Sequence, residues 1–142
     1  MFMRSWGFLA VLVVIVFSAG AASGAEKPES QNPIQREMAA LDSALKTTID
    51  AVVLNEPARI SPAFEEVNRI REQVEQALRT GTRISLPRNQ KRFKEFVRLD
   101  NKFHHELEVL LRAANKNSMG VVQRQTHRLL DSCVRCHAIF RN

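Results

Sequence analysis

The chain has 142 residues, 44% of them hydrophobic, with two cysteines and a net charge of +6 from 21 basic and 15 acidic residues. This length fits a single domain, and two cysteines are too few for a disulfide-stabilised scaffold. A multidomain enzyme, a membrane protein with several spans and a small disulfide-rich protein are therefore excluded.

An apolar leader opens the chain. Residues 7–17 carry no charge, the basic residue Arg4 precedes them, and small residues predominate from Ser18 to Ala25. This pattern is typical of a secretory signal peptide. An uncleaved membrane anchor is the alternative, but the apolar run is shorter than the ~20 residues that a spanning helix needs. We expect a signal peptide at 1–25, cleavage after Ala25, and an exported mature domain at 26–142.

Four helices are predicted in the mature domain, because apolar residues recur at spacings of three and four. The first follows Pro33 and carries an apolar stripe from Ile34 to Val52. The second begins at Ser61-Pro62, a hydroxyl cap followed by a first-turn proline. The third spans about 88–115, and the fourth carries apolar residues from Val122 to Phe140. Short connections predict an all-α, antiparallel up-down-up-down four-helix bundle. In such a bundle the first helix begins where the fourth helix ends.

The candidate chemistry lies near the C-terminus, in Cys133-Val134-Arg135-Cys136-His137. C-x-x-C-H is the attachment signature of a c-type haem. Thiols at positions i and i+3 of a helix lie on one side and can reach the two vinyl groups of one haem. His137 is then the proximal ligand of the iron. We expect one covalent haem c, held beside the C-terminal helix.

Cysteine and histidine at this spacing have three alternative roles: a zinc site, a redox-active pair and a structural disulfide. A zinc site would need a further protein ligand, and the adjacent Cys136 and His137 make a poor tetrahedral pair. A thioredoxin-like redox pair would begin a helix after a strand, whereas this pair lies at the end of a helix. A disulfide between Cys133 and Cys136 is the third alternative, since an exported protein can form one.

The leader, the four helices and the C-terminal CVRCHAIFR resemble the cytochrome c′ family, although only that last segment is a specific match. The resemblance implies a periplasmic bundle with one haem and, often, a homodimer. Some members leave the iron five-coordinate and bind nitric oxide or carbon monoxide. Others place a methionine of the first helix on the iron and carry electrons. No acid/base pair for enzymatic catalysis is visible.

Met38 is the candidate for the sixth iron ligand. At 1.5 Å per residue, it and His137 differ in height along the bundle by about 3 Å, and Met38 belongs to the apolar stripe. His/Met is a standard haem ligation, whereas core filling is the ordinary role of methionine. Met119 lies at the far end of the bundle. His104 lies too far along its helix to reach an iron near His137, and we expect it at the edge of the core with its hydrogen bonds satisfied. His105 and His127 are expected on the surface.

The heights of residues along the bundle also predict which side chains surround the haem. Phe93, Phe96 and Phe140 are expected to pack against the porphyrin. Arg141 follows His137 by four residues and so stands one helical turn beyond it. The resemblance also implies a basic residue at this place.

A basic cluster is expected at the haem end of the bundle. Between residues 79 and 102, only Glu95 and Asp100 oppose eight cations: Arg79, Arg83, Arg88, Lys91, Arg92, Lys94, Arg98 and Lys102. A solvated helix face is the ordinary explanation for such a cluster. Alternatively, one or two of these cations pair with haem propionates and the rest steer an acidic redox partner protein. Nucleic-acid binding is not supported, because no aromatic platform for bases is present. The leading hypothesis is an electron carrier, and a gas-binding protein is the alternative.

Overall fold

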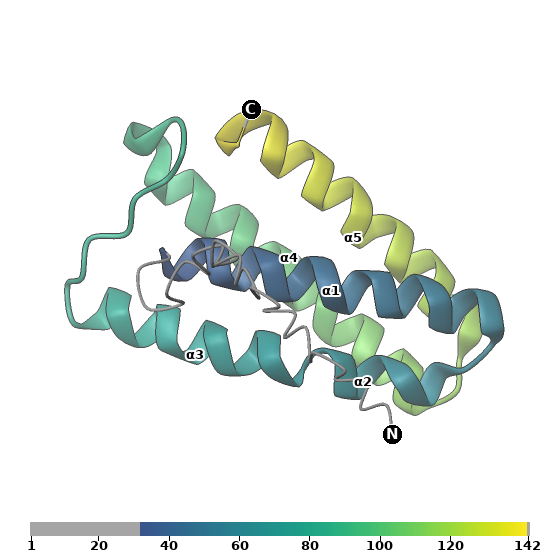
Figure 1. Cartoon of the computed structure of the whole chain (residues 1–142). Coiled ribbons are helices and arrows are strands. Elements are labelled where there is room, and N and C mark those ends of the chain that lie inside the picture. The colour runs from purple at the N-terminus through teal and green to yellow at the C-terminus, as the bar shows by residue number, and fades with distance from the viewer. Residues whose placement is uncertain (1–31, 142) are drawn as a thin grey trace, which may run out of the picture.

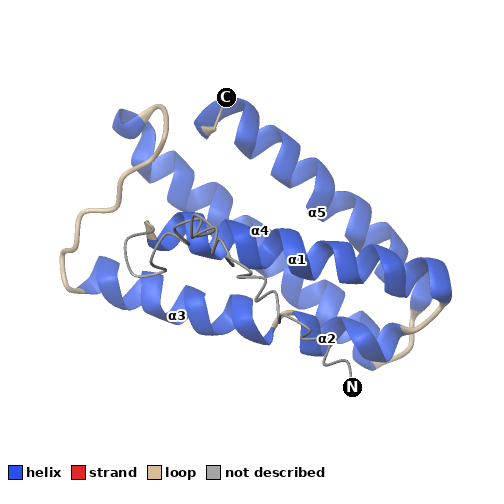
Figure 2. Cartoon of the chain, viewed as in Figure 1, coloured by secondary structure: helices blue, strands red, loops and turns tan. Residues whose placement is uncertain are grey.

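The computed structural model describes residues 32–141, and every regular element in that range is a helix (Figures 1 and 2). The predicted signal peptide, residues 1–25, lies outside the described residues. Four long helices are present: α1 (Pro33–Leu54), α3 (Glu65–Arg79), α4 (Phe93–Asn115) and α5 (Met119–Phe140). The short helical segments are η2 (Pro57–Arg59), α2 (Ile60–Ala63) and η3 (Gln90–Arg92). Among the described helices, none combines the length and the apolar character needed to cross a membrane.

α1 begins and ends as the sequence predicts, but its buried face is wider than the predicted apolar stripe. The Asn32 side chain caps its start by accepting a hydrogen bond from the backbone N–H of Ile34, at 3.1 Å. The left-handed Asn55 follows its last turn. The most buried face also includes polar Glu37 and Thr48, whereas Ile49 on the predicted apolar stripe is 41% exposed. The predicted stripe faces the cavity described below, which Met38, Leu41, Leu45 and Ile49 line.

The predicted cap at Ser61 is wrong. Helical structure already begins with the turn of η2, so Ser61 lies inside α2, and its hydroxyl donates to Asn115 Oδ1 at 2.7 Å. Phe64 interrupts the helix between α2 and α3 and is fully buried. The inner face of α3 is as predicted, with Val67, Ile70 and Val74 buried.

The third long helix begins later than predicted. Asn89 has a φ of 57°, in the left-handed region, so no α-helix can pass through it. The Gln90 side chain turns back on the preceding segment, accepting from the Leu86 backbone N–H at 2.7 Å and donating to the Ile84 carbonyl at 3.2 Å. α4 therefore begins at Phe93 rather than near Arg88.

The segment from Ser85 to Asn89 joins the start of α1 to the end of α5. Asn32 donates through its side chain to the Ser85 carbonyl. The Arg88 backbone N–H donates to the Phe140 carbonyl at 3.2 Å, and the Asn89 side chain donates to the Ile139 carbonyl. These bonds satisfy carbonyl groups at the end of α5 that have no partner within the helix. The start of α1 and the end of α5 are thus held at one end of the molecule (Figure 1).

Two groups of buried apolar side chains form the core. The larger group includes Ile60, Phe64, Leu110, Val122 and Leu129, all fully buried. The smaller group lies at the end held by the 85–89 segment and contains Ile34, Ile70, Val74, Ile84, Leu86, Phe96 and Phe140. α4 packs along α5, while α1 packs against both α3 and α5.

Candidate functional site

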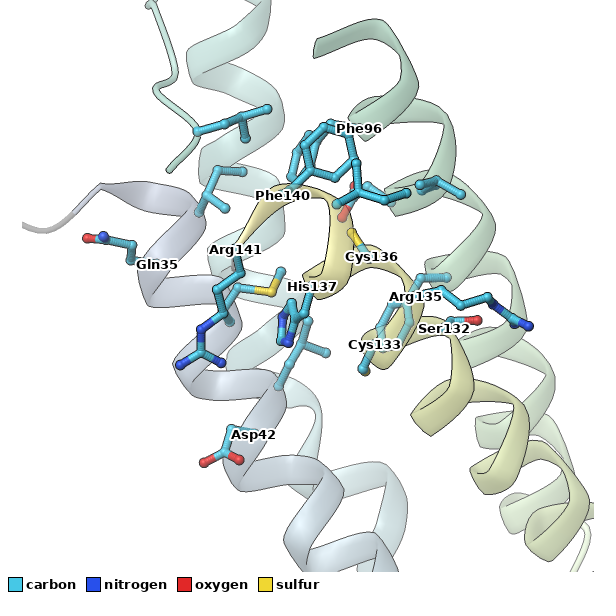
Figure 3. A pocket seen from close by; sticks show the side chains of 18 of the residues that line it. Gln35, Asp42, Phe96, Ser132, Cys133, Arg135, Cys136, His137, Phe140 and Arg141 are labelled. Atoms are coloured by element: carbon cyan, nitrogen blue, oxygen red, sulfur yellow. The ribbon is translucent and has the colours of Figure 1, made fainter. Parts of the chain in front are cut away.

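A cavity of about 1170 Å³ lies between α1, α4 and α5 and is closed on one side by Ser85, Leu86 and Pro87 (Figure 3). Its volume is slightly above the roughly 300–1,000 Å³ typical of ligand sites. Apolar side chains of α1 and α4, among them Leu41, Leu45 and Leu99, line much of it. Of the predicted site residues, seven line this cavity: Met38, Phe96, Cys133, Cys136, His137, Phe140 and Arg141.

Both cysteines are half-buried free thiols on the cavity side of α5. They lie one helical turn apart, yet Cys133 packs against the larger core group and Cys136 against the smaller one. Burial raises the pKa of both thiols, and the nearby negative charge of Asp100 further raises the pKa of Cys136. Both thiols therefore face the cavity from within a weakly hydrated wall.

His137 projects from α5 toward α1, and the side chain of Arg141 lies near it (Figure 3). The backbone N–H of Arg141 donates to the His137 carbonyl at 2.9 Å, which places the arginine one turn further on as predicted. Burial lowers the pKa of His137, and the positive charge of Arg141 lowers it further. The imidazole therefore favours its neutral form, which is the form that binds metals.

Met38 brings a thioether from α1 to the same cavity. It is half-buried and packs against both core groups. This position is consistent with the predicted approach to His137 from the opposite helix. Met119, at the start of α5, packs against the larger core group and does not line the cavity.

Phe96 and Phe140 form an aromatic wall of the cavity. Their ring centroids are 5.5 Å apart, and the rings meet edge to face. Phe93 differs from the prediction, because it stacks on Phe96 with centroids 6.0 Å apart and does not line the cavity. Phe93 therefore supports Phe96 rather than forming the wall itself.

The predicted basic cluster runs from the end of α3, through the segment that contacts the end of α5, into the first part of α4. All eight cations are exposed. Arg92 pairs with Glu95, with Nε–Oε2 at 2.7 Å, and its guanidinium lies 5.9 Å from the Phe140 ring centroid. Lys102 lines the cavity, and so do Lys46 and Arg135, which sequence reasoning did not select. The sequence pattern did not reveal Lys46 and Arg135, because a charged residue at the edge of an apolar stripe has the same spacing as an ordinary surface residue.

The histidines outside the motif do not line the cavity. His105 and His127 are exposed, as predicted. His104 is buried, as expected for a core-edge position, but the prediction that its hydrogen bonds are satisfied is wrong. Its Nε2 lies 3.0 Å from Glu37 Oε1, and neither atom has a hydrogen-bond partner among the described residues.

A scan against protein-family models, a search of curated proteins and a search of solved structures each found no match to this chain.

Proposed function

We propose that this chain is an exported, periplasmic electron-transfer protein, a monohaem c-type cytochrome built as an antiparallel up-down-up-down bundle. One observation carries the proposal. A single large cavity is lined by Met38 of α1 and by Cys133, Cys136 and His137 of α5, the residues whose chemistry the sequence singled out. The resemblance of CVRCHAIFR to the cytochrome c′ family points to the same function.

The residues present fit a haem c. Cys133 and Cys136 are free thiols one turn apart at the cavity wall, as two thioether bonds to one ring require. The cavity has an aromatic wall of Phe96 and Phe140 and room for a large planar ligand. When bound, the haem supplies an iron that exchanges one electron.

Each of this chain's residues then has a defined part. The two cysteines hold the group, and His137 offers a neutral imidazole nitrogen as the proximal ligand. Met38 offers a thioether from the opposite helix. The apolar walls would limit water around a bound haem, which is one of the means by which proteins set a haem potential.

Covalent attachment is the first test. The full chain, produced in a host that attaches c-type haem, should stay red after denaturation and acid–acetone extraction. Replacing both cysteines by serine should make the haem fully extractable. Ser132→Ala, a change at a neighbouring cavity residue, should leave it attached. A wild-type protein that carries no covalent haem would contradict the proposal.

The sixth ligand is the second test. We expect a low-spin ferric spectrum with a sulfur-to-iron charge-transfer band that disappears in Met38→Ala. Met119→Ala is the matched control, because Met119 does not line the cavity, and the band should persist there. A high-spin wild type that binds carbon monoxide rapidly when ferrous would replace electron transfer with the gas-binding alternative.

The exposed cations around residues 79–102 favour an acidic redox partner protein. Because electrostatic steering is screened by salt, electron transfer to such a partner should slow as ionic strength rises. Stopped-flow measurements with one acidic and one basic electron-transfer protein test this. Equal salt dependence for both would contradict steering by the cluster.

A further inference from the structure

A second group of chemistry-bearing side chains lies outside the haem-ligand set. Glu37 of α1 is 1% exposed and His104 of α4 is 7% exposed. His104 Nε2 lies 3.0 Å from Glu37 Oε1 and 3.7 Å from Asp100 Oδ1. One nitrogen and two carboxylate oxygens, one from each residue, all lie within 4.8 Å of one another. Three groups able to bind a metal ion therefore converge: Glu37 and His104 are buried, and Asp100 is half-buried at the wall of the cavity.

Two of these converging atoms do not satisfy each other. Glu37 Oε1 and His104 Nε2 are buried and have no hydrogen-bond partner among the described residues, despite their 3.0 Å separation. A buried polar atom without a partner is destabilising, because it has lost its hydrogen bonds to water. A cation placed between them would satisfy both atoms at once.

Asp100 is oriented by a neighbour on another helix. Arg71 of α3 donates from Nη1 to Asp100 Oδ2 at 3.0 Å and from Nη2 to Asn101 Oδ1 at 3.1 Å. This leaves Oδ1 on the side of His104. Hydrogen bonds of this kind, which orient a ligand from behind, are typical of metal sites. Asp100 and His104 are four residues apart, so they lie on the same face of α4.

We propose that Glu37, Asp100 and His104 bind one Zn²⁺ ion. Imidazole nitrogen and carboxylate oxygen are zinc ligands, and three protein ligands with a water molecule complete the tetrahedral coordination that zinc prefers. Two carboxylates offset the charge of the dication, which a buried site requires. The site would connect α1 to α4, and its Asp100 also lines the cavity that is proposed to hold the haem.

The ordinary alternative is a closed ion-pair network. With His104 protonated, two cations (Arg71 and His104) would balance two anions (Glu37 and Asp100) with no metal. This network predicts no specific zinc binding, so a binding experiment separates the two possibilities.

The experiment must exclude the thiols, because Cys133 and Cys136 would also bind zinc if no haem occupied them. We would use the full chain with Cys133→Ser and Cys136→Ser as the parent and titrate it with Zn²⁺ by calorimetry. We expect one ion per chain with micromolar or tighter affinity. Zinc K-edge absorption should show imidazole and oxygen ligands without a sulfur shell near 2.3 Å. The wild-type chain as purified, with any haem it carries, should bind the same additional ion.

His104→Gln and Glu37→Gln should each weaken zinc binding by at least about tenfold, since removal of even a supporting group costs 10–100-fold at such sites. His105→Gln is the matched control, because this adjacent histidine is exposed. Circular dichroism checks that each variant is helical, and Asp100→Asn substitutes for any variant that does not fold. Zinc should also raise the melting temperature of the parent but not that of His104→Gln.

Absence of zinc binding by the parent would overturn the proposal. Binding that His104→Gln leaves unchanged, or that His105→Gln removes, would overturn it as well. None of these results bears on covalent haem attachment, which is tested separately by extraction, so failure of either proposal can be recognised without the other.

Discussion

The two halves of α5 differ although they belong to one continuous helix. From Met119 to Leu129, the inward residues Val122, Gln125, Thr126 and Leu129 are buried among neighbouring helices. From Leu130 to Phe140, only Phe140 is buried, and the inward positions are two cysteines and a histidine at a cavity wall. The first half is specified by close packing. In the second half, the cysteines and the histidine are only half-buried and line the cavity.

The largest expected effect on stability is in the packed half. Leu129→Ala removes a fully buried side chain and should lower the free energy of unfolding by about 2–5 kcal/mol. Val134→Ala, in the second half, should change it by less than about 0.5 kcal/mol, because Val134 is 70% exposed. Urea denaturation of the two variants, followed by circular dichroism, measures the contrast. Equal losses would mean that the two halves are packed alike.

The next effect concerns the segment that holds the end of α5. Asn89→Ala should lower the free energy of unfolding by about 1–2 kcal/mol, because it loses both the bond to the Ile139 carbonyl and a residue suited to a left-handed backbone. Asn117→Ala is the matched control. Asn117 is also left-handed, with φ 52°, but no side-chain hydrogen bond of Asn117 is present in the described residues. If the two variants lose equal stability, the side chain of Asn89 does not hold α5.

A smaller effect is expected at the aromatic wall. Because Phe96 and Phe140 meet edge to face, a double-mutant cycle of Phe96→Leu and Phe140→Leu should give a coupling of about 0.5–1.5 kcal/mol. Phe64 and Phe140 belong to different core groups, so the corresponding cycle should be additive. Chemical denaturation of the single and double variants measures both cycles, and an additive first cycle would contradict a specific ring contact.

The smallest effect is expected on the α1 side of the cavity. Lys46 and Asp42 form an ion pair at 2.6 Å, but their side chains are 72% and 65% exposed. Lys46→Gln should therefore change the free energy of unfolding by less than about 0.5 kcal/mol. Thermal unfolding at low and high salt checks this. A decrease in the free energy of unfolding above about 1 kcal/mol would show that the Lys46–Asp42 ion pair stabilises this wall of the cavity.

Much of the fold and of the cavity was predictable from the sequence, because both depend on local patterns. Helical periodicity located the four long helices, and C-x-x-C-H located three residues that line the cavity. The heights of the two methionines along the bundle favoured Met38 over Met119 as the residue near His137. Met38 lines the same cavity as His137, and Met119 does not.

The burial of Glu37 and the exposure of Ile49 could not be predicted in this way. A hydropathy pattern assigns an acidic residue such as Glu37 to the surface and Ile49 to the core, and here both assignments fail. Glu37 is buried opposite His104, which lies on a helix 67 residues further along the chain. Only the assembled bundle brings these two residues together, so no spacing in the sequence reveals the cluster. The later start of α4 escaped prediction for a related reason, since it follows from the backbone conformation of Asn89.

The two thiols pack against different parts of the core, Cys133 against the larger group and Cys136 against the smaller one. A rigid ring bonded to both sulfurs would fix this turn of α5 where it contacts both groups. That turn would then open less readily on its own than the same turn without the ring. Without that ring, amide hydrogen exchange in the end of α5 should be faster than in its first half, because the end could open alone.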